Sequence, residues 1–297
     1  MRIAVTTLIA GFEHVVRENE PLAPYTRLNL GGVAEFFAEP TNLEELVGLV
    51  QKFSAEKLPI RLLGSGSNIL VREEGVPGLV LHLTSHEFTK IAVDNDQIIA
   101  GGGARMSHFV ATAVREGLSG PEQLVGIPGT VGGALHSNTG ALGVGLGNWL
   151  QSADVLTRAG EVMTRDRDAL TFSYNKSSLN ELVILNARFQ FDREDSEILT
   201  RRMQKLWIVR RAARPISDQN AAYIFKDHGG EKAGDLIEAA GLKGTQVGHV
   251  EISDRDPNVF VAHPESTSSD VLRLMELVKT QVADRLSVEL EPAIQIW

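Results

Sequence analysis

The stretch GIPGTVGGALHSNTGALG, residues 126–143, is the most informative segment of this chain. It contains six glycines and few large side chains, so ordering its backbone costs much conformational entropy. A segment of this kind usually persists because its backbone lies against a flat or charged ligand. It does not match the G-x-G-x-x-G pattern that opens a dinucleotide-binding helix, and no Lys-Ser or Lys-Thr pair follows it as in a P-loop. The sequence therefore does not support a nicotinamide-binding Rossmann domain.

A second glycine-rich loop, GSGSN at residues 64–68, directly follows the apolar run 59–63. Gly64 and Gly66 allow a tight turn and a close approach of the backbone to a ligand. The serine and asparagine side chains supply hydrogen-bond donors, and consecutive backbone N–H groups can form an anion-binding nest. A pyrophosphate is the natural partner for such a loop, although a plain turn between two strands explains this loop alone equally well.

Composition excludes several classes of protein. The 297 residues carry a net charge of −9, which argues against a nucleic-acid-binding surface. The chain has no cysteine, which excludes disulfides and zinc–thiolate sites, and no His, Asp or Glu cluster has metal-ligand spacing. The apolar N-terminal stretch is interrupted by Gly11, Glu13 and His14 and is too short to span a membrane. We interpret it as the first helix of a soluble, cytoplasmic protein with no membrane contact.

Hydrophobic patterning changes character along the chain, from strand-rich to helical after Asp192. Strands are predicted at residues 59–63, 69–71, 79–83, 98–100, 182–191, 259–262 and 293–297. Helices are predicted at residues 106–116, 196–211 and 269–286, the last capped by Ser268 or Ser269. The change predicts a domain boundary near residues 192–215.

The two glycine-rich loops, taken in order with further motifs, carry a resemblance to a known family. The further motifs are YTRLNLGG (25–32), FSYNKSS (172–178), RRAARP (210–215), YIFKD (223–227) and AGDLIEAAGLKG (233–244). Together they resemble the UDP-N-acetylenolpyruvoylglucosamine reductases from about residue 20 to the end of the chain. The resemblance implies an α+β fold with an FAD-binding domain of the vanillyl-alcohol oxidase type. That domain is expected over residues 1–192, in subdomains of about 20–90 and 91–192, with a C-terminal α/β substrate-binding lobe over residues 200–297.

The resemblance also implies the chemistry. In this family NADPH reduces a non-covalently bound FAD, and hydride then passes to the enolpyruvyl double bond of a UDP-sugar. The product, UDP-N-acetylmuramic acid, is a building block of the bacterial cell wall. The residues expected to bind FAD are Gly64, Ser65, Gly66, Ser67, Asn68, Gly126, Ile127, Pro128, Gly129, Thr130, Gly132, Gly133, Ala134 and Asn138.

Three positions depart from the family's catalytic pattern. Asn175 stands where the family has an arginine, Tyr223 where it has a proton-donating serine or cysteine, and Ala293 where it has a glutamate. The substrate side has changed as well, with Arg255, Asp256, Ala262 and Asp227 at positions where the family usually carries other residues. Lys226 is retained, and Arg211 and Arg214 are weaker candidates for substrate contacts because arginine binds diphosphates well.

Three hypotheses about activity stay open. In the first hypothesis, the chain is an active reductase of the family that uses substitute residues such as Tyr223. Alternatively, it is a flavoprotein that has lost the reaction and acts as a protein partner in cell-wall synthesis. The third hypothesis is a flavin oxidoreductase for a different small molecule. The retention of the flavin loops alongside a changed substrate side favours weakened or lost family activity.

Overall fold

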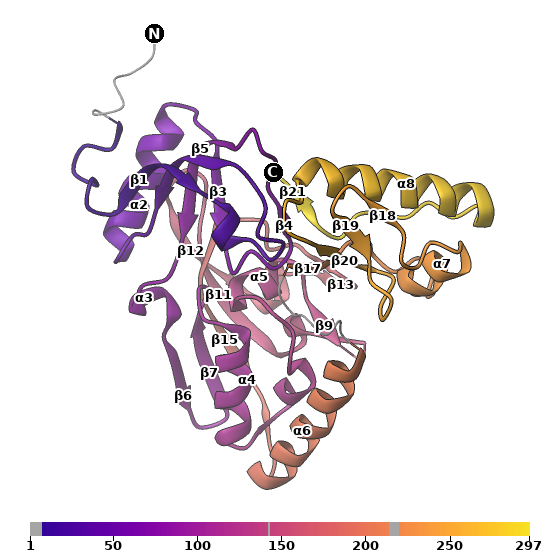
Figure 1. Ribbon diagram of the computed structural model, residues 1–297. Helices are drawn as coiled ribbons and strands as arrows, with labels where there is room; N and C mark the ends of the chain where they lie inside the picture. Colours follow the sequence, from indigo (N-terminus) through magenta and orange to yellow (C-terminus); the bar gives the residue numbers. More distant parts are fainter. Residues whose placement is uncertain (1–7, 142, 214–219) are drawn as a thin grey trace. The chain divides into compact units, whose positions relative to one another are not determined.

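The computed structural model describes residues 8–141, 143–213 and 220–297. The chain packs into two compact units (Figure 1), and neither is continuous in sequence. The first unit comprises residues 1–18, 35–65 and 77–210, and the second comprises 19–34, 66–76 and 211–297. The sequence predicts continuous domains, so the assignment of two short N-terminal segments to the second unit is information that only packing supplies.

One sheet of the first unit has five strands in the order β12-β11-β15-β7-β6, and every neighbouring pair is antiparallel. Its strands are β6 (Ile91–Asp94), β7 (Gln97–Gly101), β11 (Leu150–Leu156), β12 (Val162–Asp166) and β15 (Val183–Gln190). Alternate side chains of β15, from Val183 to Phe189, are buried as the sequence predicts, and Ile184 is buried as well.

Two helices share the core of this sheet, α4 (Met106–Arg115) and α5 (Val131–His136). Phe109 of α4 packs edge-on against Phe189 of β15, with ring centroids 5.0 Å apart. Leu135 of α5 is fully buried in the same cluster. The glycine-rich segment that begins at residue 126 therefore leads into a helix, α5, whose apolar side chains are packed in this core.

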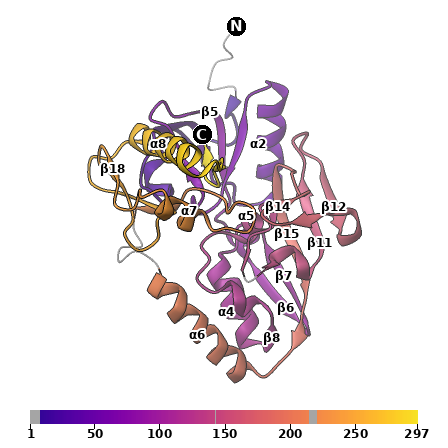
Figure 2. The same cartoon turned by 90° about the vertical axis from the view of Figure 1, so that its right-hand side faces the viewer.

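A second sheet has the strand order β1-β2-β5-β3, with β3 parallel to β5. Its strands are β1 (Val16–Pro21), β2 (Val33–Ala38), β3 (Ile60–Leu63) and β5 (Val76–His82). Helix α2 (Leu43–Ala55) accompanies this sheet (Figure 2) and buries Leu46, Leu49, Val50 and Phe53 in its core. Asn42 caps the helix by accepting a hydrogen bond from the Glu45 N–H.

The remaining elements up to residue 213 are short, except for the 18-residue helix α6. They are η1 (Ala23–Tyr25), α3 (His86–Thr89), β8 (Leu118–Ser119), η2 (Pro121–Leu124), β9 (Gly140–Ala141), β10 (Val144–Gly145), η3 (Leu146–Trp149), η4 (Arg167–Ala169), β13 (Phe172–Ser173), β14 (Lys176–Ser177), β16 (Asp192–Arg193) and α6 (Ser196–Ala213). The N-terminal helix prediction is wrong for residues 9–15, which form turns because Gly11 adopts a φ of +86°. Residues 1–7 of that prediction lie outside the described residues.

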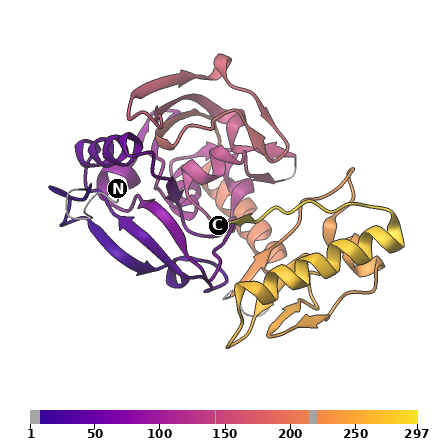
Figure 3. The ribbon, with the colours of Figure 1, turned by 90° about the horizontal axis from the view of Figure 1, so that it is seen from above.

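The second unit is built on a four-stranded antiparallel sheet in the order β17-β20-β19-β18. Its elements are β17 (Ala221–Tyr223), α7 (Ala233–Ala239), β18 (Gln246–Val247), β19 (Val250–Ile252), β20 (Val259–Ala262) and α8 (Ser268–Leu286). Figure 3 shows α8 lying along this sheet, and its buried stripe of Val271, Leu274, Val278 and Val282 explains that position. The antiparallel order of this sheet and of the five-stranded sheet excludes a doubly wound parallel architecture for the residues in them.

The last residues of the chain return to the loop region near residue 68. Strand β21 (Gln295–Ile296) pairs in parallel with β4 (Ile69–Leu70). The Asn68 side chain donates a hydrogen bond to the Ala293 carbonyl at 2.9 Å. The segment after the 64–68 loop is therefore tied to the C-terminal end within the second unit.

No helix in the described residues is long and apolar enough to cross a membrane. Over the same residues, no group of three or more His, Asp or Glu side chains is arranged to hold a metal ion.

Helix α8 is capped by Thr267, one residue before the predicted Ser268 or Ser269. The Thr267 hydroxyl accepts from the Asp270 N–H at 3.1 Å, and the Asp270 carboxylate accepts from the Thr267 N–H at 3.0 Å. This reciprocal pair is a capping box. Burial raises the pKa of Asp270, but the bonds from Arg273 and Thr267 outweigh burial and lower the pKa below its usual value.

We expect Thr267→Ala to lower the free energy of unfolding by about 0.5–2 kcal/mol, because it removes the cap of a long core helix. Thr267→Ser keeps the hydroxyl and is the matched control.

Because the folded-state pKa of Asp270 is depressed, the contribution of this carboxylate to stability is present above the unfolded-state pKa. It is lost as pH falls through the folded-state value. Urea unfolding of wild type and Asp270→Asn at neutral and acidic pH checks this. An equal acid-induced loss of stability in both proteins contradicts it.

Candidate active site

The 64–68 loop makes a turn that only glycine fits at its centre. Gly66 is buried with φ +62°, and a Cβ atom there would overlap the carbonyl oxygen of Tyr25. The Gly66 carbonyl accepts a hydrogen bond from the Arg27 N–H at 3.0 Å. The YTRLNLGG motif and this loop therefore pack backbone to backbone. Of the predicted FAD ligands in the loop, Ser65 and Asn68 are exposed and Ser67 is half-buried.

The 126–134 loop lies against a second glycine-rich segment, residues 101–105. The Met106 N–H donates to the Gly129 carbonyl at 3.0 Å, the Val131 N–H donates to Ala104 at 2.8 Å, and the Gly132 N–H donates to Gly102 at 2.8 Å. A Cβ on Gly132 would lie 3.0 Å from the Gly102 carbonyl oxygen, which leaves little room for a side chain. The triple glycine at residues 101–103 is thus a structural partner of the loop. The run of three glycines is the feature of the sequence that indicates this role.

Within the first unit, Gly64 of one predicted flavin loop lies beside Thr130 of the other. A Cβ on Gly64 would lie 3.0 Å from the Thr130 hydroxyl oxygen, which itself caps α5 by accepting from the Gly133 N–H at 3.3 Å. Gly133 is exposed, and a Cβ there would approach only Thr130, at 3.3 Å. The surface formed by Gly64, Thr130 and Gly133 carries almost no side-chain bulk. Such a surface fits a planar ring or a phosphate group against exposed backbone.

Asn138 ends the loop and joins it to a neighbouring hairpin. Its side chain is buried, donates to the Ser173 carbonyl at 2.8 Å and accepts from the Gly147 N–H at 3.1 Å. Both ends of the amide are therefore engaged by protein backbone, so Asn138 positions the hairpin. Its predicted contact with FAD stays a prediction.

That hairpin consists of β13 and β14 and contains Asn175, the first of the three positions predicted to depart from the family's catalytic pattern. Asn175 lies in its turn, is exposed and has φ +51°. Asparagine tolerates this left-handed conformation better than most other residues. Phe172, which precedes the turn, packs beneath the guanidinium of Arg167 at 5.0 Å from the ring centroid.

Residues 34–165 match the family model described as "FAD binding domain", and residues 214–297 match "UDP-N-acetylenolpyruvoylglucosamine reductase, C-terminal domain". The UDP-N-acetylenolpyruvoylglucosamine reductase of Rhodopirellula baltica is 37% identical over 96% of this chain and 93% of its own length. The reductase of Listeria innocua is 35% identical over 98% of both chains.

The chain belongs to the UDP-N-acetylenolpyruvoylglucosamine reductase family. A crystal structure of the Thermus caldophilus reductase has a TM-score of 0.81 and 33% identity, covering 95% of this chain and 99% of its own. The predictions of family, α+β fold and FAD as cofactor are confirmed by these matches.

The other two changed positions lie on adjacent segments of the second unit. Tyr223 ends β17 and is 47% exposed. The Ala293 N–H donates to the Ile224 carbonyl at 2.7 Å, and the Lys226 N–H donates to the Glu291 carbonyl at 2.9 Å. The segments 223–226 and 291–293 are therefore paired, so that the reductase-family positions 223 and 293 are neighbours in this unit.

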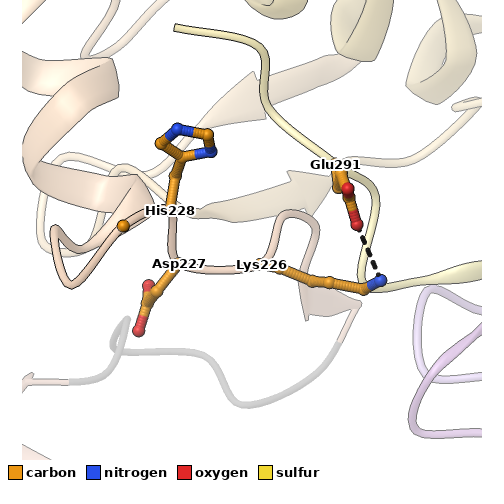
Figure 4. Close-up of a pocket in the computed structure, with 5 residues that line it drawn as sticks. Lys226, Asp227, His228 and Glu291 are labelled. Carbon is orange, nitrogen blue, oxygen red and sulfur yellow. Dashed lines mark hydrogen bonds and ion pairs between the residues drawn. The ribbon is translucent and has the colours of Figure 1, made fainter. Parts of the chain in front are cut away.

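A pocket in the second unit is lined by Lys226, Asp227, His228, Gly229 and Glu291 (Figure 4). The Lys226 ammonium forms an ion pair with the Glu291 carboxylate at 3.1 Å. Asp227 and His228 point to opposite sides of their segment, and Asp227 accepts a hydrogen bond from the Ala233 N–H at 3.0 Å. Retained Lys226 is thus held by a carboxylate, and the Asp227 carboxylate stabilises the start of α7.

The arginines of α6 differ in their contacts. Arg202 bonds the buried carboxylate of Glu122 at 2.8 Å and Glu194 at 2.7 Å, and it lowers the pKa of Glu194. Arg210 donates to the Gln123 and Val125 carbonyls. Arg211 is exposed near the end of the helix, and Arg214 lies outside the described residues. The Arg202 guanidinium thus compensates a buried negative charge while its side chain stays 42% exposed.

We expect the purified protein to carry FAD and Gly133→Val to abolish its binding, because a branched side chain would occupy the open surface beside Thr130. Gly133→Ala should bind FAD, since the added Cβ meets only the Thr130 hydroxyl. Ser107→Val, at an exposed position of α4, controls for a β-branched residue in a helix. Absorbance in the flavin bands after gel filtration measures occupancy. Full FAD content in Gly133→Val would show that this loop does not bind the cofactor.

Proposed function

We propose that this protein is a cytoplasmic, FAD-containing member of the reductase family, associated with peptidoglycan synthesis, in which the reduction of UDP-N-acetylenolpyruvoylglucosamine is weakened or lost. The observation that supports this most directly is the simultaneous replacement of positions 175, 223 and 293. Bound FAD would supply the hydride chemistry, with NADPH as reductant. Gly64, Thr130 and Gly133 would hold the cofactor through open backbone surface.

Asn175 offers a neutral amide where the resemblance implies a guanidinium. An amide donates a hydrogen bond but brings no charge to a developing enolate, and removal of one such donor typically costs about 10²–10³ in rate. Asn175 lies in the turn of the hairpin, and Lys176, the next residue, begins β14. We assign this lysine no role in place of the arginine.

Tyr223 and Ala293 change the proton donor and the carboxylate. A phenol is a stronger acid than a serine hydroxyl, so Tyr223 has the chemistry of a substitute donor but is much larger. Ala293 has no proton to exchange. Glu291 lies two residues away in the sequence, and its exposed carboxylate pairs with Lys226. Loss of positioned acid–base help costs about 10²–10⁴ in rate.

An active reductase that uses Tyr223 is the second candidate, because Tyr223 is 47% exposed at the end of β17. A third candidate is a flavin oxidoreductase for another small molecule. The ion-paired Lys226 and the carboxylates of Asp227 and Glu291 support it, because they make this pocket less attractive to a diphosphate. A purely binding role with a protein partner in cell-wall synthesis is the remaining form of the lost-activity proposal.

We expect NADPH to reduce the bound flavin, and the enolpyruvyl UDP-sugar to reoxidise it at least about 10²-fold more slowly than ordinary enzymatic turnover. Stopped-flow absorbance of the flavin, with and without the UDP-sugar, separates the two half-reactions. Steady-state turnover of about 1–10³ per second on this substrate would reject the proposal and assign Tyr223 as a working general acid. Flavin that NADPH reduces but only another acceptor reoxidises would favour the third candidate.

We expect the triple variant Asn175→Arg, Tyr223→Ser, Ala293→Glu to recover more activity than the sum of the single changes, because groups that act together are not additive. A second triple variant with Ala293→Gln keeps the size of the side chain but not its charge, and serves as control. Asn175→Arg alone carries a conformational penalty at φ +51°. Equal activity of the two triple variants would show that the carboxylate at position 293 is not what the reaction lacks.

A further inference from the structure

We propose that Arg210 is a positioning residue for the flavin loop: its guanidinium holds the two carbonyls from which the chain enters residues 126–130. The inference rests on the proposed assignment of FAD to the 126–134 loop. It adds a residue on a different element, α6, which acts on the cofactor through the backbone at the entry of the loop.

The contacts of Arg210 are directed at the segment immediately before the loop. One terminal nitrogen donates to the Gln123 carbonyl at 2.7 Å, and the other donates to the Val125 carbonyl. Val125 is the last residue before Gly126, where the backbone turns with φ +76°. A planar guanidinium that bonds two carbonyls fixes both the position and the direction of the chain, which a single-point ammonium does less well.

A second arginine on the same face of α6 holds the other end of this segment. Arg202 lies eight residues earlier, about 12 Å along the helix axis. It bonds Glu122, whose fully buried carboxylate also accepts from the Gly120 N–H at 2.6 Å. Segment 120–125 is therefore attached to α6 at both ends, and Arg210 is the attachment nearer to the loop.

The far end of the loop is held independently. Backbone hydrogen bonds join residues 129–132 to residues 102–106, and Thr130 caps α5. Between these fixed ends, the Ile127 N–H donates to the Leu124 carbonyl at 3.1 Å. Loss of Arg210 would release the entry of the loop while its exit stays in place, so the surface against which the cofactor lies would lose its fixed shape.

The test uses the full-length protein, stripped of FAD and titrated with FAD, followed by quenching of flavin fluorescence and by the visible circular dichroism of the bound flavin. We expect Arg210→Met to raise the dissociation constant of FAD about tenfold or more and to change the visible dichroism. Arg210→Lys should recover part of both. Arg201→Met is the matched control, because Arg201 is exposed on the same helix and forms an ion pair with Glu197, one turn earlier.

Unchanged affinity and dichroism in Arg210→Met, with only a lower unfolding temperature of the apoprotein, would overturn the inference and leave Arg210 as an anchor of α6. If Arg210→Met does not fold, Arg210→Lys decides the matter by the same two readouts. If Gly133→Val loses FAD while the Arg210 variants bind normally, this inference alone fails. If Gly133→Val also binds FAD normally, the assignment of the loop to the cofactor fails instead.

Discussion

The close approach of two backbones, residues 101–106 and 129–132, is the contact on which the candidate flavin site depends. Three hydrogen bonds between 2.8 and 3.0 Å connect these segments, and a side chain on Gly132 would press against Gly102. The glycines allow this distance, and the distance in turn sets where α5 begins. Thr130 then caps α5 and contacts the position of Gly64, so both glycine-rich loops share one small-residue surface.

Around this contact, side chains that lack a place in catalysis position the loops. Asn138 connects the end of one loop to the hairpin that carries Asn175, and Arg210 connects its entry to α6. Both act through backbone carbonyls, because the loops themselves are too poor in side chains to be held otherwise. Backbone hydrogen bonds have a similar role in the second unit, where they pair two segments and bring Tyr223 close to Ala293.

The proposed function rests on the combination of a retained cofactor scaffold and a substrate side that is predicted to differ from the family pattern. The backbone geometry of the loops needs glycine at a few positions, and those glycines are present. The chemistry of the substrate side needs particular functional groups, and Asn175, Tyr223 and Ala293 do not supply the ones that the family pattern carries. In a reductase of this kind a fold can therefore persist while its reaction changes, since packing and proton transfer depend on different atoms.

The sequence by itself determined the family, the cofactor and the main elements, because long glycine-rich motifs in a given order and the buried alternation of β15 are local patterns. The prediction that positions 175, 223 and 293 have lost the family's catalytic residues also comes from the sequence. Only the tertiary structure decided that residues 19–34 and 66–76 pack with the C-terminal residues, that Arg202 neutralises a buried glutamate, and that Arg210 bonds the entry of the flavin loop. These contacts join residues that are 80 to more than 200 positions apart in the sequence, and local patterns carry no information about contacts at such separations.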